Sequence, residues 1–276
     1  MSRSETYFFL EQEGHLARSC LCNGLSALRK ANLGNKKGLF YSAFFELSIG
    51  FERTMKLILI IDHMAKNKLV PPDSKTIENY KHDLLKLFGA TKDICIARNL
   101  TTLDSFDAGS LSYILLTFLA NFADTSGRYA NINKLTGHRH QTMSDPLVQW
   151  NDIVNRIIRE HATKKQRQHA RMNGQIATSA FGGMTTSQFS DLNKQIPDVD
   201  GLHTRASELD VAAKYAIFAL ITLIASLREV IDSSYRSTRM AKPSGQSGLD
   251  DVPDMKEFFQ FAYADRKYVM RKMRWP

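Results

Sequence analysis

The sequence has little cysteine and no cysteine pattern of a recognised kind. It holds three cysteines among 276 residues, and two of these, Cys20 and Cys22, are one residue apart. So few cysteines exclude a disulfide framework, and the spacing lacks the second Cys or His pair that a zinc site needs. We therefore expect a reduced, cytoplasmic protein without a bound metal.

Signals for secretion, membrane insertion and cofactor binding are also lacking. The stretch MSRSETYFFLEQEGH has no basic segment followed by an apolar one, so we expect no signal peptide. The most apolar run, 215–227, is too short to span a bilayer and is typical of a buried core helix. FGGM at 181–184 lacks the lysine and the preceding strand of a phosphate-binding loop. We expect neither a membrane partner nor a cofactor.

Strand signals are scarce, whereas apolar residues recur at spacings of three and four through much of the chain. This pattern predicts an all-α protein. We expect helices over 14–31, 39–67, 74–89, 107–123, 146–162, 207–235 and 255–274. Ser144-Asp145-Pro146 is typical of a helix start. The polar stretch 164–203 predicts a long loop or an inserted excursion, and 237–253 predicts a linker.

The excess of positive charge favours a polyanionic partner. The chain has 37 Lys and Arg against 28 Asp and Glu, a net charge of +9, which suits RNA, DNA or an acidic protein. KKQRQHAR and DRKYVMRKMRW concentrate this charge, and the second interleaves aromatic residues as nucleic-acid-binding surfaces do. A helix that docks on a protein partner would look similar. The predicted nucleic-acid patch comprises Lys164, Lys165, Arg167, Arg171, Arg271, Lys272 and Arg274.

Charged residues interrupt the apolar helix predicted over 39–67. Glu46, Gly50 and Arg53 share one of its faces, because they are four and three residues apart. Glu46 and Arg53 are separated by roughly 10 Å of helix rise, so we expect each to pair with another helix or subunit. Gly50 would let that neighbour approach closely. The pattern is consistent with a structural polar network and also with a binding or catalytic role.

The stretch YKHDLLKLF, 80–88, places a histidine and an aspartate before an apolar run. His82 and Asp83 could cap the following helix, bond to the preceding long helix, or form a catalytic dyad. The succession of FFELSIGFERTMKLILI, a proline-containing turn and YKHDLLKLF resembles the HEPN family. These are small helical bundles of prokaryotic toxins, phage-defence proteins and nucleotidyltransferase partners. The resemblance covers residues 14–162, and it implies that His82-Asp83 marks the fold and orients two helices.

Nuclease members of that family carry Arg-x4–6-His on the last bundle helix and meet as two copies. The resemblance therefore implies metal-independent RNA cleavage, with histidine as acid or base and arginine neutralising phosphoryl charge. The match here is RIIREH, from Arg156 to His161, with Ile157 where the family usually has a polar residue. His161 also continues an apolar stripe that starts at Leu147, so a buried core histidine is the alternative.

A polar segment at 127–140 lies between two predicted helices. Amides and arginines suit phosphate or base-edge contacts, and tyrosine can stack on a base. Alternatively, the asparagines bond to the backbone of their own loop. A metal at the histidines is not supported, since no third ligand lies at helical spacing. The candidate binding residues are Arg128, Tyr129, Asn131, Asn133, His138, Arg139 and His140.

The sequence thus predicts a HEPN-like bundle over 1–162, a basic polar loop or insertion over 163–206, and a helical extension over 207–276 that packs on the bundle. The predicted function is that of a cytoplasmic protein of bacterial defence or toxin type that acts on RNA as a homodimer. Metal-independent endoribonuclease activity would fall to Arg156 and His161. The alternative is a non-catalytic subunit that binds nucleic acid or a protein partner. An exposed His161 beside Arg156 at a dimer cleft would favour the nuclease, and a buried one the binder.

Overall fold

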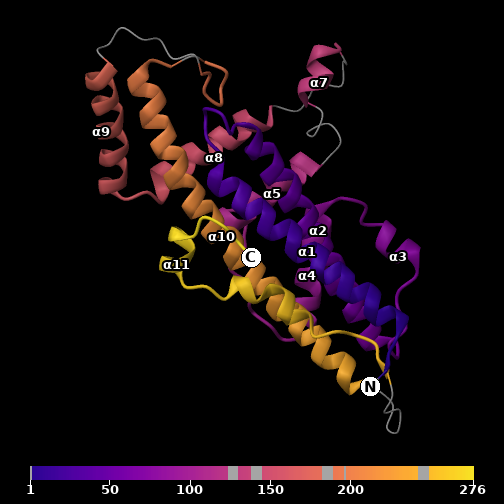
Figure 1. Cartoon of the computed structure of the whole chain (residues 1–276). Coiled ribbons are helices and arrows are strands. Elements are labelled where there is room, and N and C mark those ends of the chain that lie inside the picture. The colour runs from indigo at the N-terminus through magenta and orange to yellow at the C-terminus, as the bar shows by residue number, and fades with distance from the viewer. Residues whose placement is uncertain (1, 124–129, 138–144, 182–188, 196, 242–248) are drawn as a thin grey trace.

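The chain folds into an elongated bundle of helices, whose long axis runs from upper left to lower right in Figure 1. The computed structural model describes residues 2–123, 130–137, 145–181, 189–195, 197–241 and 249–276. The predicted all-α class is confirmed. In chain order the elements are β1 (Ser2–Arg3), α1 (Glu5–Lys30), α2 (Gly38–Lys66), α3 (Ser74–Glu78), α4 (Leu84–Ala97), α5 (Leu111–Ala123), α7 (Ala130–Leu135), α8 (Pro146–Glu160), α9 (Lys164–Phe181), α10 (Val199–Met240), β2 (Leu249–Asp250), the 3-10 helix η1 (Met255–Ala262) and α11 (Arg266–Arg271).

The N-terminal part of the bundle is an antiparallel pair of long helices, α1 and α2. The side chain of Ser4 starts α1 by accepting a hydrogen bond from the backbone N–H of Tyr7 at 3.1 Å. The helices pack closely at Gly50, where a β-carbon would lie 2.9 Å from the backbone nitrogen of Leu21. Gly50 therefore does admit a close neighbour, and that neighbour is α1 of the same chain rather than a second subunit.

The central element is α10, which is 42 residues long and contacts α2, α5, α8, α9, η1 and α11. Its middle part joins one continuous apolar core with residues such as Phe44, Phe51 and Trp150. Part of α10 is long and apolar enough to cross a membrane, but 67% of that window is buried inside the fold, as in the core helix of a soluble protein. The helix predicted over 207–235 is thus present and extends further at both ends.

The prediction of a long loop over 164–203 is wrong, because α9 forms within it. Ala170, Gly174 and Ala177 give α9 a face of small, buried residues, and this helix packs on α10. A β-carbon at Gly174 would lie 2.7 Å from the carbonyl oxygen of Asp200. Within α9 the exposed polar side chains are those of Lys164, Lys165, Gln168, His169, Arg171, Gln175 and Ser179.

Two other predicted helices are interrupted. The helix expected over 74–89 divides into α3 and α4, with Lys81 in the left-handed region at φ 48° between them. The helix expected over 255–274 divides into η1 and α11. Tyr263, with ψ 64°, ends η1, and Asp265 starts α11 by accepting from the Tyr268 N–H at 3.0 Å. The apolar spacing of the sequence continues across both breaks, so it does not predict where the helices are interrupted.

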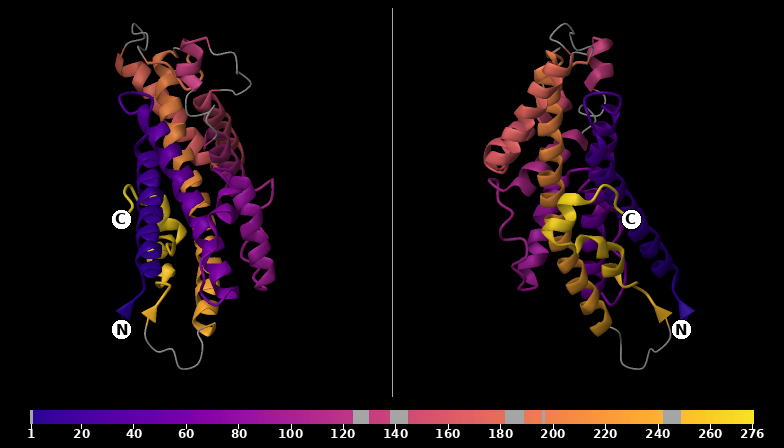
Figure 2. Two further views of the ribbon diagram at one scale, coloured as in Figure 1. Left: turned by 90° about the vertical axis from the view of Figure 1, so that its right-hand side faces the viewer. Right: turned by 60° about the vertical axis from the view of Figure 1, so that its left-hand side comes forward.

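The helix start predicted at Ser144-Asp145-Pro146 is confirmed for its described residues. The side chain of Asp145 accepts a hydrogen bond from the backbone N–H of Leu147 at 2.9 Å, and Pro146 is the first residue of α8. At the other end of the molecule, β1 pairs in parallel with β2, with Ser2 opposite Leu249. Figure 2 shows the two short strands side by side near the N-terminus.

Candidate nucleic-acid interface

Two of the predicted polar-network residues line a cleft of about 400 Å³ between α1, α2 and the segment leading into α4. The cleft is lined by Glu13, Ile49, Glu52, Arg53, Lys56, Leu57, Ile60, Ile77 and His82. Arg53 and His82 were predicted, whereas Glu13 and Glu52 were missed. Arg53 forms an ion pair with Glu13 of α1, and Lys56 Nζ lies 2.7 Å from a carboxylate oxygen of Glu52. The charges of the cleft are therefore largely paired.

His82 and Asp83 have separate structural roles. Nδ1 of His82 lies 3.1 and 3.0 Å from the two carboxylate oxygens of Glu52 on α2. A carboxylate only accepts, so Nδ1 of His82 is the donor in this contact. Asp83 instead caps α4 by accepting from the backbone N–H groups of Leu85 and Lys86 at 3.1 and 3.0 Å. Asp83 is thus a helix cap, and His82 forms a bond to α2.

Glu46 also faces α1. Burial and a hydrogen bond with Glu46 raise the pKa of the Cys20 thiol to about 11. Burial likewise raises the pKa of Cys22 to about 11. Both thiols are thus protonated near neutral pH. They are poor nucleophiles in this form, because the nucleophilic form of cysteine is the thiolate. Glu46 and Arg53 contact α1 rather than each other, in agreement with their separation along α2.

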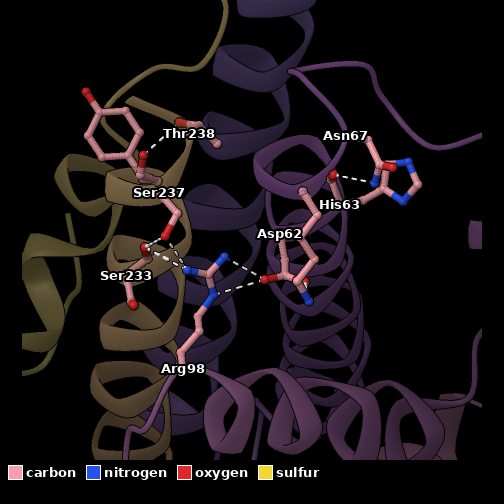
Figure 3. A network of polar contacts seen from close by, with 9 residues as sticks. Asp62, His63, Asn67, Arg98, Ser233, Ser237 and Thr238 are labelled. Carbon is pink, nitrogen blue, oxygen red and sulfur yellow. Dashed lines mark hydrogen bonds and ion pairs between the residues drawn. The ribbon is translucent and has the colours of Figure 1, made fainter. Parts of the chain in front are cut away.

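A buried polar network, missed by the sequence analysis, ties three helices together (Figure 3). Nε and Nη2 of Arg98, at the end of α4, donate to one carboxylate oxygen of Asp62 on α2 at 2.9 and 2.6 Å. Nη1 donates to the Ser233 carbonyl at 3.1 Å and to the Ser237 hydroxyl at 2.5 Å, both on α10. Asp62 is 5% exposed, so this arginine satisfies a buried charge. We assign the network a structural role.

Arg156 and His161 lie at the C-terminal end of α8. Nε of Arg156 donates to Glu160 at 2.8 Å, and Nη2 donates to the Gly109 carbonyl at 3.3 Å. Hydrogen bonds from Arg156 and Arg159 lower the pKa of Glu160. His161 is exposed, so the alternative of a buried core histidine is wrong. The helix ends at Glu160, and the buried residue that follows is Ala162 instead.

Tyr215 on α10 brings together three segments that are distant in the sequence. Its ring stacks with that of His161, with centroids 6.1 Å apart and an angle of 30° between the rings. Its hydroxyl donates to the side-chain oxygen of Gln166 on α9 at 3.1 Å. The guanidinium carbon of Arg266, the first residue of α11, lies 5.9 Å from the ring centroid. We call Tyr215, His161, Gln166 and Arg266 the Tyr215 junction.

The two predicted basic segments therefore meet at this junction, since α9 begins at Lys164 and α11 begins at Arg266. In Figure 1 both helices lie on the left of α10. The basic residues that are exposed on these segments are Lys164, Lys165, Arg171, Arg266, Lys267, Arg271 and Arg274. The sequence predicted most of these residues but not their convergence, which depends on Tyr215.

Two members of the predicted patch have structural roles instead. Nη1 of Arg167 donates to the carbonyls of Ile158 and Ala162 at 3.2 and 2.6 Å, so its charge lies against the C-terminal end of α8. Nζ of Lys272 hydrogen bonds to the Tyr268 hydroxyl and lies 5.0 Å from the ring centroid of Trp275. Lys272 therefore helps to hold the C-terminal segment together.

A groove of about 890 Å³ runs between α9 and the N-terminal part of α10. We call it the hairpin groove. Its lining consists of Thr163, Lys165, Gln166, His169, Ala170, Asn173, Ile176, Ala177, Ala180, His203, Ala206, Ser207, Asp210, Val211 and Lys214. Gln166 belongs both to the groove and to the Tyr215 junction, so the two features are continuous. His169 and His203 were not singled out by the sequence analysis, because they lie 34 positions apart in what was expected to be a loop.

The predicted binding segment at 127–140 is described only in part. Arg128, Tyr129, His138, Arg139 and His140 lie outside the described residues. The Asn131 side chain donates to the Tyr41 hydroxyl of α2 at 2.9 Å. Asn133 is half-buried on α7. The described asparagines thus include one that bonds to another helix rather than to its own loop.

Within the described part of the chain, no group of three or more His, Cys, Asp or Glu side chains is placed to hold a metal ion. The chemistry available at the Tyr215 junction and the hairpin groove is that of cations, amides, imidazoles and an aromatic ring. Comparison of the chain with protein-family models, with curated proteins and with solved structures found no match.

Proposed function

We propose that this chain is a HEPN-like, cytoplasmic protein of bacterial defence or toxin type that binds RNA across the Tyr215 junction. The observation that carries the proposal is the meeting of two basic segments, about a hundred residues apart, at one tyrosine on α10. The assignment to defence or toxin biology rests on the resemblance of the α2–α4 motifs to the HEPN family.

The charge of α9 supports a polyanionic partner. Its residues 164–181 include four Lys or Arg and no Asp or Glu. Lys164, Lys165 and Arg171 are exposed, and α11 adds the exposed cations Arg266, Lys267 and Arg271. A basic surface with the exposed imidazole of His161 and the amide of Gln166 at its centre suits an RNA backbone together with its bases.

Salt dependence of RNA binding tests this proposal. Binding to a polyanion releases counterions, so the association constant should fall steeply as salt concentration rises. The double variant Lys164→Glu with Arg171→Glu should weaken RNA binding and flatten its dependence on salt. The control is Lys75→Glu with Arg239→Glu, which makes the same charge change at exposed positions on α3 and at the far end of α10. Equal effects from both pairs would reject the interface.

A second candidate function is metal-independent cleavage of RNA by Arg156 and His161. The exposure of His161 at the same junction favours this activity over a purely structural histidine. Arg156 would have to exchange Glu160 for a phosphate, because its Nε is engaged by that carboxylate. Incubation of the purified protein with total RNA in EDTA tests the activity. Fragments that disappear with His161→Ala would support it, and intact RNA would leave binding as the function.

We also propose that the protein forms a homodimer, as HEPN-like domains generally do. The face around Gly50 packs against α1 within the chain, so a second copy must use another surface. Light scattering at micromolar concentration should give twice the monomer mass. A monomer mass would reject the dimer, and co-purification with a different subunit would favour a protein partner.

A further inference from the structure

We propose that the hairpin groove binds an unpaired stretch of RNA, with bases between α9 and α10 and the backbone along the exposed cations of α9. This inference rests on the proposed RNA-binding function and names the form of RNA that the site accepts. The groove is one continuous surface with the Tyr215 junction through Gln166.

The geometry of the groove follows from how α9 packs on α10. The helices are antiparallel, because Asn173 donates to the Ser207 hydroxyl at 2.9 Å while Gln166, one end of the groove, meets Tyr215. Small residues at Ala170 and Ala177 bring the helices together, and the longer side chains beside them form the walls of the groove. A volume of about 890 Å³ is that of a site for an organic ligand rather than for a single ion.

The lining offers groups that suit bases and phosphates. Lys165 and Lys214 lie toward the Tyr215 junction and supply positive charge. His169 and His203 are exposed imidazoles, and a histidine ring is one of the planar groups on which unpaired bases stack. Ile176, 62% exposed, provides an apolar surface toward the other end.

Asp210 is the acidic residue of the lining, and its charge is compensated. One carboxylate oxygen accepts from Arg29 at 2.5 Å, and the other lies 2.6 Å from Nζ of Lys214. Two cations against one carboxylate leave this part of the groove positive. The carboxylate therefore does not oppose the approach of a phosphate.

The position of the groove distinguishes unpaired RNA from a duplex. In A-form RNA the major groove is deep and narrow, and base faces are stacked inside the helix. A duplex could contact the cations on the outer side of α9, such as Lys164 and Arg171, which do not line the groove. Its bases could not enter between α9 and α10, whereas the bases of a single strand can.

Binding of a 12-nucleotide single strand and of the matching duplex, each with a fluorescent label, tests the inference. The variant His169→Ala with His203→Ala should weaken single-strand binding by about tenfold, because stacking partners are lost, and leave duplex binding unchanged. The variant Lys164→Glu with Arg171→Glu should weaken both. Equal effects of the histidine variant on both RNAs, or no effect on either, would overturn the groove as the site while RNA binding itself stands.

A groove-filling variant gives an independent test. Ala206 lines the groove and is exposed, so Ala206→Trp should occupy the space for bases without removing a packing contact. Gln175→Trp adds the same side chain at an exposed position of α9 outside the groove. Only Ala206→Trp should reduce single-strand affinity. Reduction by both, or by neither, contradicts the groove site, and failure of the unmodified protein to bind any RNA overturns the proposed function as well.

Discussion

The imidazole of His161 stacks on the phenol ring of Tyr215, with the ring centroids 6.1 Å apart. This contact joins the end of α8 to the helix that forms the centre of the core. Because His161 is exposed while Tyr215 is 8% exposed, the histidine covers the tyrosine from the solvent side. A ligand that reaches His161 therefore also reaches the meeting point of the two basic segments.

Replacement of His161 by alanine separates the functional from the structural role of this contact. An exposed side chain at a helix end leaves no buried cavity, so the free energy of unfolding should change by less than about 1 kcal/mol. RNA binding should weaken, and cleavage should be lost if the protein cleaves RNA. Thermal denaturation and RNA titration of the same variant check both statements. A lower melting temperature with unchanged RNA binding would show that His161 serves only the fold.

The sequence predicts the start of α8 better than its end. Asp145 and Pro146 identify the start by a local mechanism, since the cap and the proline act within one helical turn. The apolar stripe correctly predicts the buried residues Trp150 and Ile157. It also includes His161, because periodicity carries no information on where the last turn stops.

Long-range partners account for most of what the sequence missed. Glu52 contacts His82 from 30 positions away, and Tyr215 contacts Gln166 across 49 positions. Helix α9 is mostly polar apart from a face of small residues. The need for glycine at 174 arises only because Asp200 and Thr204 of α10 lie against it. A sequence shows which side chains are present, but pairing between distant helices depends on how the whole chain packs.

Asp83 should matter more for stability than His82. Removal of the N-cap by Asp83→Ala leaves the Leu85 and Lys86 N–H groups without their carboxylate and should cost about 1 kcal/mol. His82 is 68% exposed in its ion pair with Glu52, so His82→Ala should cost less, about 0–1 kcal/mol. Urea denaturation of both variants measures the order. Asp83→Asn is the control that keeps the cap, and a larger loss for His82→Ala than for Asp83→Ala would refute the assignment.

Loss of Arg98 should destabilise the protein strongly. The variant Arg98→Met leaves the buried carboxylate of Asp62 with Lys66 as its remaining cation, at a cost of about 3 kcal/mol. The double variant Arg98→Met with Asp62→Leu should recover much of that loss, because no buried charge then remains. Chemical denaturation compares the two with Arg236→Met, a surface control. If the double variant is less stable than the single one, the network contributes more than charge compensation.

Gly174 should be required for the docking of α9. The β-carbon of Gly174→Ala would meet the carbonyl oxygen of Asp200 at 2.7 Å and its side chain more closely still. Overpacking of this kind costs about 1–3 kcal/mol and should push α9 away from α10. Hydrogen exchange of the α9 amides should accelerate. The matched control is Gly89→Ala, whose β-carbon would meet nothing within 4 Å and should be neutral or stabilising. Unchanged exchange in α9 would show that the packing accommodates the added methyl group without displacing the helix.

The ion pairs of Asp210 should make stability depend on pH in the acidic range. Burial acts to raise the pKa of this carboxyl, but hydrogen bonds from Lys214 and Arg29 outweigh it and lower the pKa below the ordinary value of 3.8. The folded state therefore holds the charged form more strongly than the unfolded chain does. This stabilisation is fully present above the unfolded pKa and is lost as pH falls through the folded pKa.

The variant Asp210→Asn should therefore lower the free energy of unfolding at neutral pH, where it weakens the compensation of Arg29, an arginine only 8% exposed. The expected loss is on the order of 1–2 kcal/mol, because the carboxylate itself is half exposed to water. Below about pH 4 the difference between the variant and the unmodified protein should shrink, since Asp210 is then increasingly protonated in the unfolded and finally in the folded state. Denaturation at a series of pH values measures this difference.

The control is Asp232→Asn. Its partner Arg236 is 68% exposed, so this variant should lose less free energy of unfolding than Asp210→Asn does. A difference for Asp210→Asn that stays constant from pH 7 to pH 3 would mean that the carboxylate contributes through packing rather than through its charge.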